Sequence, residues 1–213
     1  MSKDLNPKKA LIFRITHRDN VPWILDNGLH CRSSQNLDPN FVSIGNPELI
    51  DKRQHRVVDI PPGGTLDDYI PFYFTPFSPM MYNIKTGWGG ITQRPNREIV
   101  ILVSSLNKLV DEGGVFVFSD RHAYLQVAQF SASLADLDRI DWSNLQARDF
   151  RRGSDDVGKI ERYQAEALVH RHMPVHWLRG IACYNDAIKE KFDGLLEERD
   201  MRVKIVAKPS WYF

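Results

Sequence analysis

Cysteine and long apolar runs are scarce in this sequence. Cys31 and Cys183 are its two cysteines, and without a CxxC spacing or a histidine cluster they argue against both a disulfide framework and a zinc site. No apolar run approaches the roughly 18 residues that cross a bilayer. The N-terminal MSKDLNPKKA also lacks the apolar segment of a secretory signal. These absences predict a protein of the cytoplasm that is soluble and does not enter a membrane.

An excess of one charge is missing too. Lys and Arg number 28 and Asp and Glu 27, for a net charge of +1, so contact with nucleic acid has to come from a local basic surface. GxGxxG, GxxxxGK[ST], HExxH and GxSxG do not occur, which removes the commonest nucleotide-binding and hydrolase signatures. With 213 residues, 42% of them hydrophobic and 26% charged, the chain predicts one globular domain spanning residues 1–213.

The elements that can be predicted are short strands mixed with a few helices. Strands are expected at 10–16, 97–105, 115–120 and 202–208, with a short one at 41–44. Helices are expected at 21–28, 48–58, 122–138 and 186–200. Three prolines in 69–84 exclude a long helix and predict short edge strands and loops, and the polar segment 141–160 predicts an exposed loop. Because strand and helix do not alternate regularly, the pattern indicates an α+β fold.

Glu166 stands in the mostly apolar segment YQAEALV, residues 163–169. A carboxylate against a core is costly unless it is paired or used. If the segment is a strand, Gln164 and Glu166 project from the same face; if it is a helix, Glu166 is merely solvated. Periodicity alone leaves both alternatives open.

A strand with Gln-x-Glu after an exposed loop resembles the catalytic segment of ADP-ribosyltransferases, in which that loop recognises the target. These enzymes also carry Arg or His in an early strand, with Thr or Ser two residues later, as in Arg14-Ile15-Thr16. Four ordered blocks, RITHRDN-xx-WIL-xx-G, PPGG-xx-xDYIPFYF-x-P-x-SPMMY, VFVFSDRHA and QAE-x-LV, are similar to the DarT family. They span residues 11–170, and weaker likeness continues to residue 213. DarT is the toxin of a bacterial toxin–antitoxin pair and ADP-ribosylates DNA.

The resemblance implies the split β-sandwich of ADP-ribosyltransferases, with flanking helices. It implies that NAD+ is the co-substrate, that nicotinamide is released, and that one ADP-ribose is transferred to a base of single-stranded DNA, thymidine being the expected target. Such a modification blocks DNA replication. The implied partner is a DarG-type antitoxin with a macrodomain, in the cytoplasm of a bacterium. No metal is implied.

Glu166 and Arg53 are the catalytic residues that the resemblance implies. Cleavage of the nicotinamide–ribose bond develops positive charge on the sugar, and a carboxylate at the ribose 2′-hydroxyl stabilises that charge most in the transition state. Glu166 is also placed to accept the proton that thymine N3 loses. An Arg just before PPGG is catalytic in the family; Arg53 is its counterpart here, with Lys52 and Arg56 as alternatives in register.

The early strand is expected to bind NAD+. Backbone groups of Arg14, Ile15 and Thr16 would hold the nicotinamide amide, with the Arg14 side chain near a ribose. His17 either orients the cofactor or is a structural histidine. Asn20 either touches the cofactor or caps the following helix.

Aromatic and basic side chains supply the remaining candidates. Among the alternating aromatics of FYF, Tyr73 is expected to face the nicotinamide, because a phenol tolerates a wet site. DNA needs cations for its phosphates and flat surfaces for unpaired bases. The DNA-binding candidates are Arg121, His122, Arg148, Arg151, Arg152 and Trp88. Phe77 departs from the family pattern, in which an Arg often precedes SPM.

Two other functions stay open on the residues. An ADP-ribosyltransferase acting on protein or RNA would share the Gln-x-Glu strand, and only the product would tell it apart. A non-catalytic nucleic-acid-binding module would leave Glu166 without a role and would release no nicotinamide.

Overall fold

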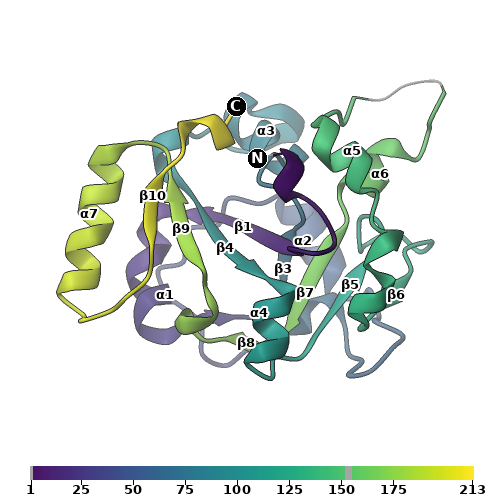
Figure 1. Ribbon diagram of the computed structural model, residues 1–213, viewed down its shortest axis with the longest axis horizontal. Helices are drawn as coiled ribbons and strands as arrows, with labels where there is room; N and C mark the ends of the chain where they lie inside the picture. Colours follow the sequence, from purple (N-terminus) through teal and green to yellow (C-terminus); the bar gives the residue numbers. More distant parts are fainter. Residues whose placement is uncertain (1, 152–154) are drawn as a thin grey trace.

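A mixed β-sheet forms the centre of the computed structural model, which describes residues 2–151 and 155–213 (Figure 1). The strands are β1 (Leu11–His17), β2 (Leu29–His30), β3 (Tyr69–Tyr73), β4 (Ile99–Ser105), β5 (Phe116–Ser119), β6 (Phe130–Ser131), β7 (Glu166–His170), β8 (His172–Met173), β9 (Gly180–Cys183) and β10 (Ile205–Ala207). The helices are α1 (Val21–Asn27), α2 (Pro47–Arg53), α3 (Pro79–Thr86), α4 (Leu106–Asp111), α5 (Trp142–Ala147), α6 (Lys159–Tyr163) and α7 (Asp186–Glu197). This is the α+β class that the sequence predicts.

The main sheet has the order β10-β9-β4-β1-β3-β7-β5-β6. Its neighbouring strands are antiparallel except β9 and β10, and β2 pairs with β8 separately. Whereas β1 pairs with β4 along its whole length, β1 and β3 share the single register pair Phe13↔Tyr73. Pro71, in the middle of β3, has no N–H to donate to either neighbour. The sheet is therefore split into two halves at the β1–β3 junction, as the split β-sandwich requires.

Several expected elements need correction. The prolines of 69–84 do not place β3 at an edge: it lies between β1 and β7, where its narrow junction with β1 tolerates Pro71. Pro79 begins α3, because Pro suits the first helical position and the Ser78 hydroxyl accepts the Met81 N–H at 3.1 Å. In 141–160 the chain forms α5 and the start of α6 rather than one loop, and 41–44 forms no strand.

The helix expected at 122–138 is also wrong. Asp120 accepts the N–H of Gln129 at 2.9 Å, which closes the intervening chain into a loop beside β5. That loop leads into β6 and then a 3-10 turn at Leu134–Arg139. The apolar residues with helical spacing thus serve a loop and a short strand, because local side-chain bonds compete with helix formation.

Strand β7 is buried on both faces. Ala167 and Val169 belong to the main hydrophobic core, while Leu168 belongs to a second, smaller cluster with Val58 and Ala123. Because side chains alternate along a strand, Glu166 shares the face of Leu168 and points toward this second cluster. The predicted strand begins later than expected, since residues 159–163 form α6.

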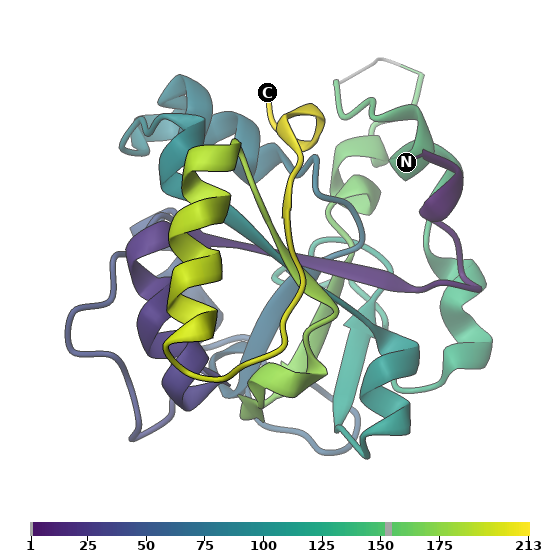
Figure 2. The same cartoon turned by 60° about the vertical axis from the view of Figure 1, so that its left-hand side comes forward.

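Helices lie at both edges of the sheet, and α2 lies behind its centre (Figure 1). α7 packs on β9 and β10 at one edge, and α5 and α6 lie beyond the opposite edge (Figures 1 and 2). The C-terminus lies next to α3, at the end of the molecule opposite α4 (Figures 1 and 2). None of the helices in the described residues is long and apolar enough to cross a membrane.

Candidate active site

Glu166 is the centre of a buried polar group. Its side chain is 3% exposed. Oε2 accepts from Arg53 Nη1 at 2.9 Å, and Oε1 accepts from the backbone N–H of Ala123 at 3.1 Å. His122 Nδ1 lies 3.3 Å from Oε1. The carboxylate is thus paired and hydrogen-bonded, which is the condition for keeping such a group in a core.

Helix α2 delivers Arg53 to this carboxylate. The helix begins with Pro47 after Asn46, whose side chain accepts the Leu49 N–H at 3.2 Å. Of the three basic residues in register, Lys52 pairs with exposed Glu48, and Arg56 donates to Leu125 O at 3.2 Å. The structure therefore places Arg53, rather than its neighbours, against Glu166.

Arg14 adds a second cation on the opposite side of the split. Its Nη1 donates to Pro71 O at 2.9 Å across the β1–β3 junction. Burial, helped by nearby Arg53, lowers the pKa of the guanidinium to about 10, so it remains charged at neutral pH. Arg14 Nε and Arg53 Nη2 are both buried without a hydrogen-bond partner in the described structure. Two guanidinium nitrogens at the wall formed by β1 and α2 therefore have no protein partner in the described structure, and they are candidates to bind a ligand.

A cavity of about 350 Å³ opens beside these arginines. Its walls come from β1, α1, β2, the segment 37–43, α2 and β3, and include Arg14, Thr16, Arg53 and Asp67. Trp23, Leu37 and Phe41 contribute apolar surface to it. A concave, mostly apolar space with a few convergent charged groups is typical of a small-molecule site.

The other cofactor candidates lie around the cavity rather than in its wall. Ile15 packs in the main core. His17 accepts the Asp19 N–H at 3.2 Å and lies 3.6 Å from Glu98, which is a structural role. Asn20 is buried, donates to Thr16 Oγ1 and Val42 O at 3.0 Å each, and accepts from Val42 N at 2.8 Å. Among the predicted cofactor residues, Arg14 and Thr16 are those that line the cavity.

Tyr73 stands opposite Glu166 in the β3–β7 ladder. Its neighbours Phe72 and Phe74 fill the core, so the alternation expected of the three aromatics is confirmed. Burial raises the pKa of the Tyr73 phenol, and Glu166 raises it further against the opposing effect of the arginines. The phenol therefore keeps its proton at neutral pH.

Gln164 does not join Glu166. It ends α6, and its Nε2 donates to Ile160 O at 3.2 Å. The expectation that both side chains project from one strand face is wrong, because helix α6 occupies the residues before β7.

The DNA-binding candidates differ in their burial and in their partners. His122 belongs to the buried Glu166 cluster, and burial lowers its pKa in spite of the Glu166 charge. Arg121 is held by Asp120 at 2.8 Å and 3.0 Å. Trp88 is 71% exposed. The remaining arginines lie in the segment before Glu166, where Arg152 falls outside the described residues.

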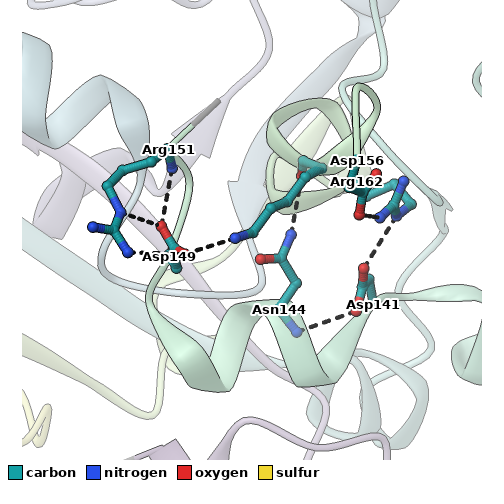
Figure 3. A network of polar contacts seen from close by, with 7 residues as sticks. Asp141, Asn144, Asp149, Arg151, Asp156 and Arg162 are labelled. Atoms are coloured by element: carbon teal, nitrogen blue, oxygen red, sulfur yellow. Dashed lines mark hydrogen bonds and ion pairs between the residues drawn. The ribbon is translucent and has the colours of Figure 1, made fainter. Parts of the chain in front are cut away.

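That segment carries its own ion-pair network (Figure 3). Asp149 accepts from exposed Arg151 at 2.8 Å and from Lys159 at 2.6 Å, and these bonds hold the pKa of Asp149 well below its usual range. Arg162 bridges Asp141 and Asp156. In the described part of this segment, Arg148 is the arginine with no carboxylate partner.

Sequence reasoning missed two features of the site. The Ala123 N–H that binds Glu166 is a backbone donor, which no residue type reveals. The cavity wall at 37–43 mixes apolar and polar residues without helix or strand periodicity, and it is fixed by the tertiary contact between Asn20 and Val42, which the sequence does not reveal.

Comparison with known proteins assigns the family. A sequence model described as ssDNA thymidine ADP-ribosyltransferase, DarT, matches residues 13–213. A DNA ADP-ribosyl transferase of Escherichia coli O127:H6 (strain E2348/69 / EPEC) is 54% identical over 212 residues, covering 100% of this chain and 97% of that protein. The chain belongs to the DarT family. The family expected from the four sequence blocks is confirmed.

Solved DarT structures share its fold. Thermus sp. 2.9 DarT in complex with ADP-ribosylated ssDNA superimposes with a TM-score of 0.88 at 32% identity, covering 97% of this chain and 98% of that one. The same protein in complex with NAD+ has a TM-score of 0.83 and covers 97% and 99%. Thermosipho africanus DarTG in complex with ADP-ribose, at 18% identity and a TM-score of 0.74, covers 95% of this chain and 51% of that one, and shows a shared fold alone.

Proposed function

We propose that this DarT-family protein transfers one ADP-ribose from NAD+ to thymidine in single-stranded DNA and releases nicotinamide. The observation that carries the assignment of residues is the contact between Arg53, which lines the cavity, and buried Glu166. Through this contact, Arg53 links a cavity large enough for a small molecule to the buried Glu166 carboxylate.

NAD+ fits the donor set of the cavity. The unpartnered nitrogens of Arg14 and Arg53 suit ribose hydroxyls and pyrophosphate oxygens. Apolar Trp23, Leu37 and Phe41 offer surface for the adenine. No group of three or more His, Cys, Asp or Glu in the described residues is arranged to hold a metal ion, and the proposed chemistry uses none.

Glu166 carries the chemistry in this proposal. The bond from ribose C1′ to nicotinamide breaks, nicotinamide leaves with the bonding electrons, and the positive charge on the sugar faces the Glu166 carboxylate. Thymine N3 then forms the new bond to C1′ and gives its proton to Glu166. Arg53 and the Ala123 N–H keep the carboxylate in place without reorganisation during the reaction.

DNA reaches the site from the side of the loop before β7. Arg121 and Arg148 are proposed phosphate contacts, and exposed Trp88 is a proposed stacking residue. Arg151 would first have to leave Asp149. With a net charge of +1, affinity for DNA should be modest and should fall as salt rises.

The state of His122 predicts a pH dependence. Burial lowers the pKa of His122, so the ring gains its proton only below the ordinary value of about 6.5. In the neutral ring Nδ1 accepts the Tyr124 N–H at 3.3 Å; a proton on Nδ1 would replace that bond with donation to Glu166 Oε1, 3.3 Å away, and compete with substrate. We expect kcat/KM to fall as the pH falls below about 6.5 and the H122N variant to shift this acid limb to lower pH. An exposed control, H176N, should leave the profile of the wild type; an acid limb unchanged by H122N would contradict the role.

Substitution of Asn20 is expected to weaken NAD+ binding. Two of the three hydrogen bonds of Asn20 hold Val42, and thereby the 37–43 wall of the cavity, while the third binds Thr16, which also lines the cavity. Asn20→Ala should raise the KM for NAD+ roughly tenfold, the effect of losing one or two hydrogen bonds, with little change in kcat. Steady-state kinetics with varied NAD+ measures this. Asn27→Ala, which loses only a bond to Trp23 O, is the control, and equal KM values for the two variants would refute the clamp.

A toxic role follows from the reaction. ADP-ribosylated thymidine blocks a replicating polymerase, and a macrodomain antitoxin of the DarG type would remove the modification in the cytoplasm of a bacterium. Induced expression should arrest growth, whereas co-expression with an ADP-ribose-removing macrodomain should restore it. Growth arrest that persists in the E166Q variant would contradict a toxicity based on transfer.

A further inference from the structure

Three aromatic rings from distant parts of the chain form a surface group that we call the aromatic platform. Its members are Tyr82 of α3, Phe150 after α5, and the C-terminal Phe213. Tyr82 and Phe213 have ring centroids 5.5 Å apart, and Phe150 lies 5.9 Å from each. Tyr82 is 42% and Phe213 39% exposed. Large rings gathered in contact at the surface mark a binding site more often than scattered single ones do.

A cation without an acidic partner adjoins the platform. Arg148 places its guanidinium over the ring of Phe77, 3.8 Å from the centroid, and Phe77 in turn lies 6.2 Å from Phe213. Arg148 is exposed and forms no ion pair in the described structure. The nearby carboxylate of Asp149 is already occupied by Arg151 and Lys159. The surface therefore combines flat apolar faces with positive charge.

The platform lies near the candidate active site, because two of its neighbours are close in the chain to β7 and to β3. Phe150 packs on Tyr163 with centroids 5.2 Å apart, and Tyr163 ends the helix that leads into Glu166. From the other side, Phe77 follows Tyr73, the ladder partner of Glu166, by four residues. Four extended residues span at most about 14 Å. A strand of DNA with its target base at Glu166 thus has its neighbouring nucleotides within reach of the platform.

We propose that the aromatic platform stacks a base flanking the target thymidine in single-stranded DNA, with Arg148 at the adjoining phosphate. The inference rests on the proposed function and names a subsite for its substrate. Exposed aromatic rings next to an unpaired cation suit single-stranded DNA. Every unpaired base offers a π-face for stacking, and every phosphate between nucleotides carries a negative charge. Stacking of this kind does not select one base, so the platform favours length of strand rather than sequence.

Strand length is therefore the variable that tests it. We expect Tyr82→Ala to raise the KM for a long thymidine-containing single strand roughly tenfold, the loss of one stacked base. For thymidine 5′-monophosphate, which has no flanking base to place on the platform, the same change should have little effect. Phe213→Ala should behave alike, and Tyr82→Trp should restore wild-type values because it restores a ring. His176→Ala, which removes an exposed ring next to Glu112 just after α4, is the matched control.

The possible outcomes separate the inference from the proposed function. A KM for the long strand that stays at the wild-type value in both alanine variants would overturn the platform while leaving the function intact. A loss of equal size on the long strand and on thymidine 5′-monophosphate would also overturn it, since that pattern belongs to a disturbed active site. If the wild-type protein modifies no single strand at all, the proposed function itself fails.

Discussion

Glu166→Gln is expected to lower kcat/KM for ADP-ribosylation of single-stranded DNA by roughly a hundred- to a thousandfold. The amide keeps the shape of the side chain and an oxygen for the Ala123 N–H. It removes the negative charge that faces the developing positive charge on the ribose, and it accepts no proton from thymine. The effect therefore appears in kcat, with little change in NAD+ binding.

The fold should survive the change. Arg53 loses its anionic partner, but its guanidinium, 12% exposed, lines the cavity and so is not sealed in the core. Rates of nicotinamide release in the presence of DNA, compared with thermal unfolding of the same samples, measure both effects. Gln164→Ala is the control two residues away, whose side chain bonds only Ile160 O in the described structure. Equal activity of E166Q and wild type would remove Glu166 from the mechanism.

Arg53→Ala is expected to lower kcat/KM roughly a hundredfold and to destabilise the fold by about 3 kcal/mol, because removing one partner of a buried ion pair leaves the other charge unpaired. Arg53 Nη1 is the charged donor to Glu166 Oε2 at 2.9 Å. Without it the carboxylate keeps the backbone donor at Ala123 and loses its orientation toward the ribose. Lysine should rescue little, since a single ammonium cannot reproduce the fixed fork of the guanidinium.

A neighbouring cation on the same helix supplies the control. Lys52 pairs with exposed Glu48 one turn away, and Lys52→Ala should leave both activity and unfolding free energy within experimental error of wild type. The double variant of Arg53 and Glu166 should cost much less than the sum of the single changes, because both act through one contact. Additive losses, or an equal loss in Lys52→Ala, would show that the contact carries no function.

The parts of the fold that could be predicted are those that local sequence determines. Strand β4 is an apolar run, α1 has Pro22 in its first turn and ends at Gly28, where φ is +79°, and α7 has an amphipathic pattern. Prediction failed where a tertiary contact overrides the local pattern. The loop at 122–129 is closed by Asp120 rather than by helical bonds, and Pro71 occupies a central strand because the sheet is split beside it.

The sequence indicated which residues belong to the candidate site better than it indicated which of them contact each other. Glu166 and Arg53 are 113 residues apart, and only the tertiary structure brings them together. The tertiary structure also shows that Asn20 contacts the cavity wall through Val42 and does not itself line the cavity. Phe77, the departure from the family pattern, turns out to be the surface on which Arg148 rests.

Mass spectrometry of a thymidine-containing single-stranded oligonucleotide after incubation with NAD+ tests the central claim most directly. One ADP-ribose on the thymidine and an equal amount of free nicotinamide are expected. Both products should fall at least roughly a hundredfold with the E166Q variant and be absent with a strand that lacks thymidine. ADP-ribose found on protein alone, or on the thymidine-free strand to the same extent, would contradict it.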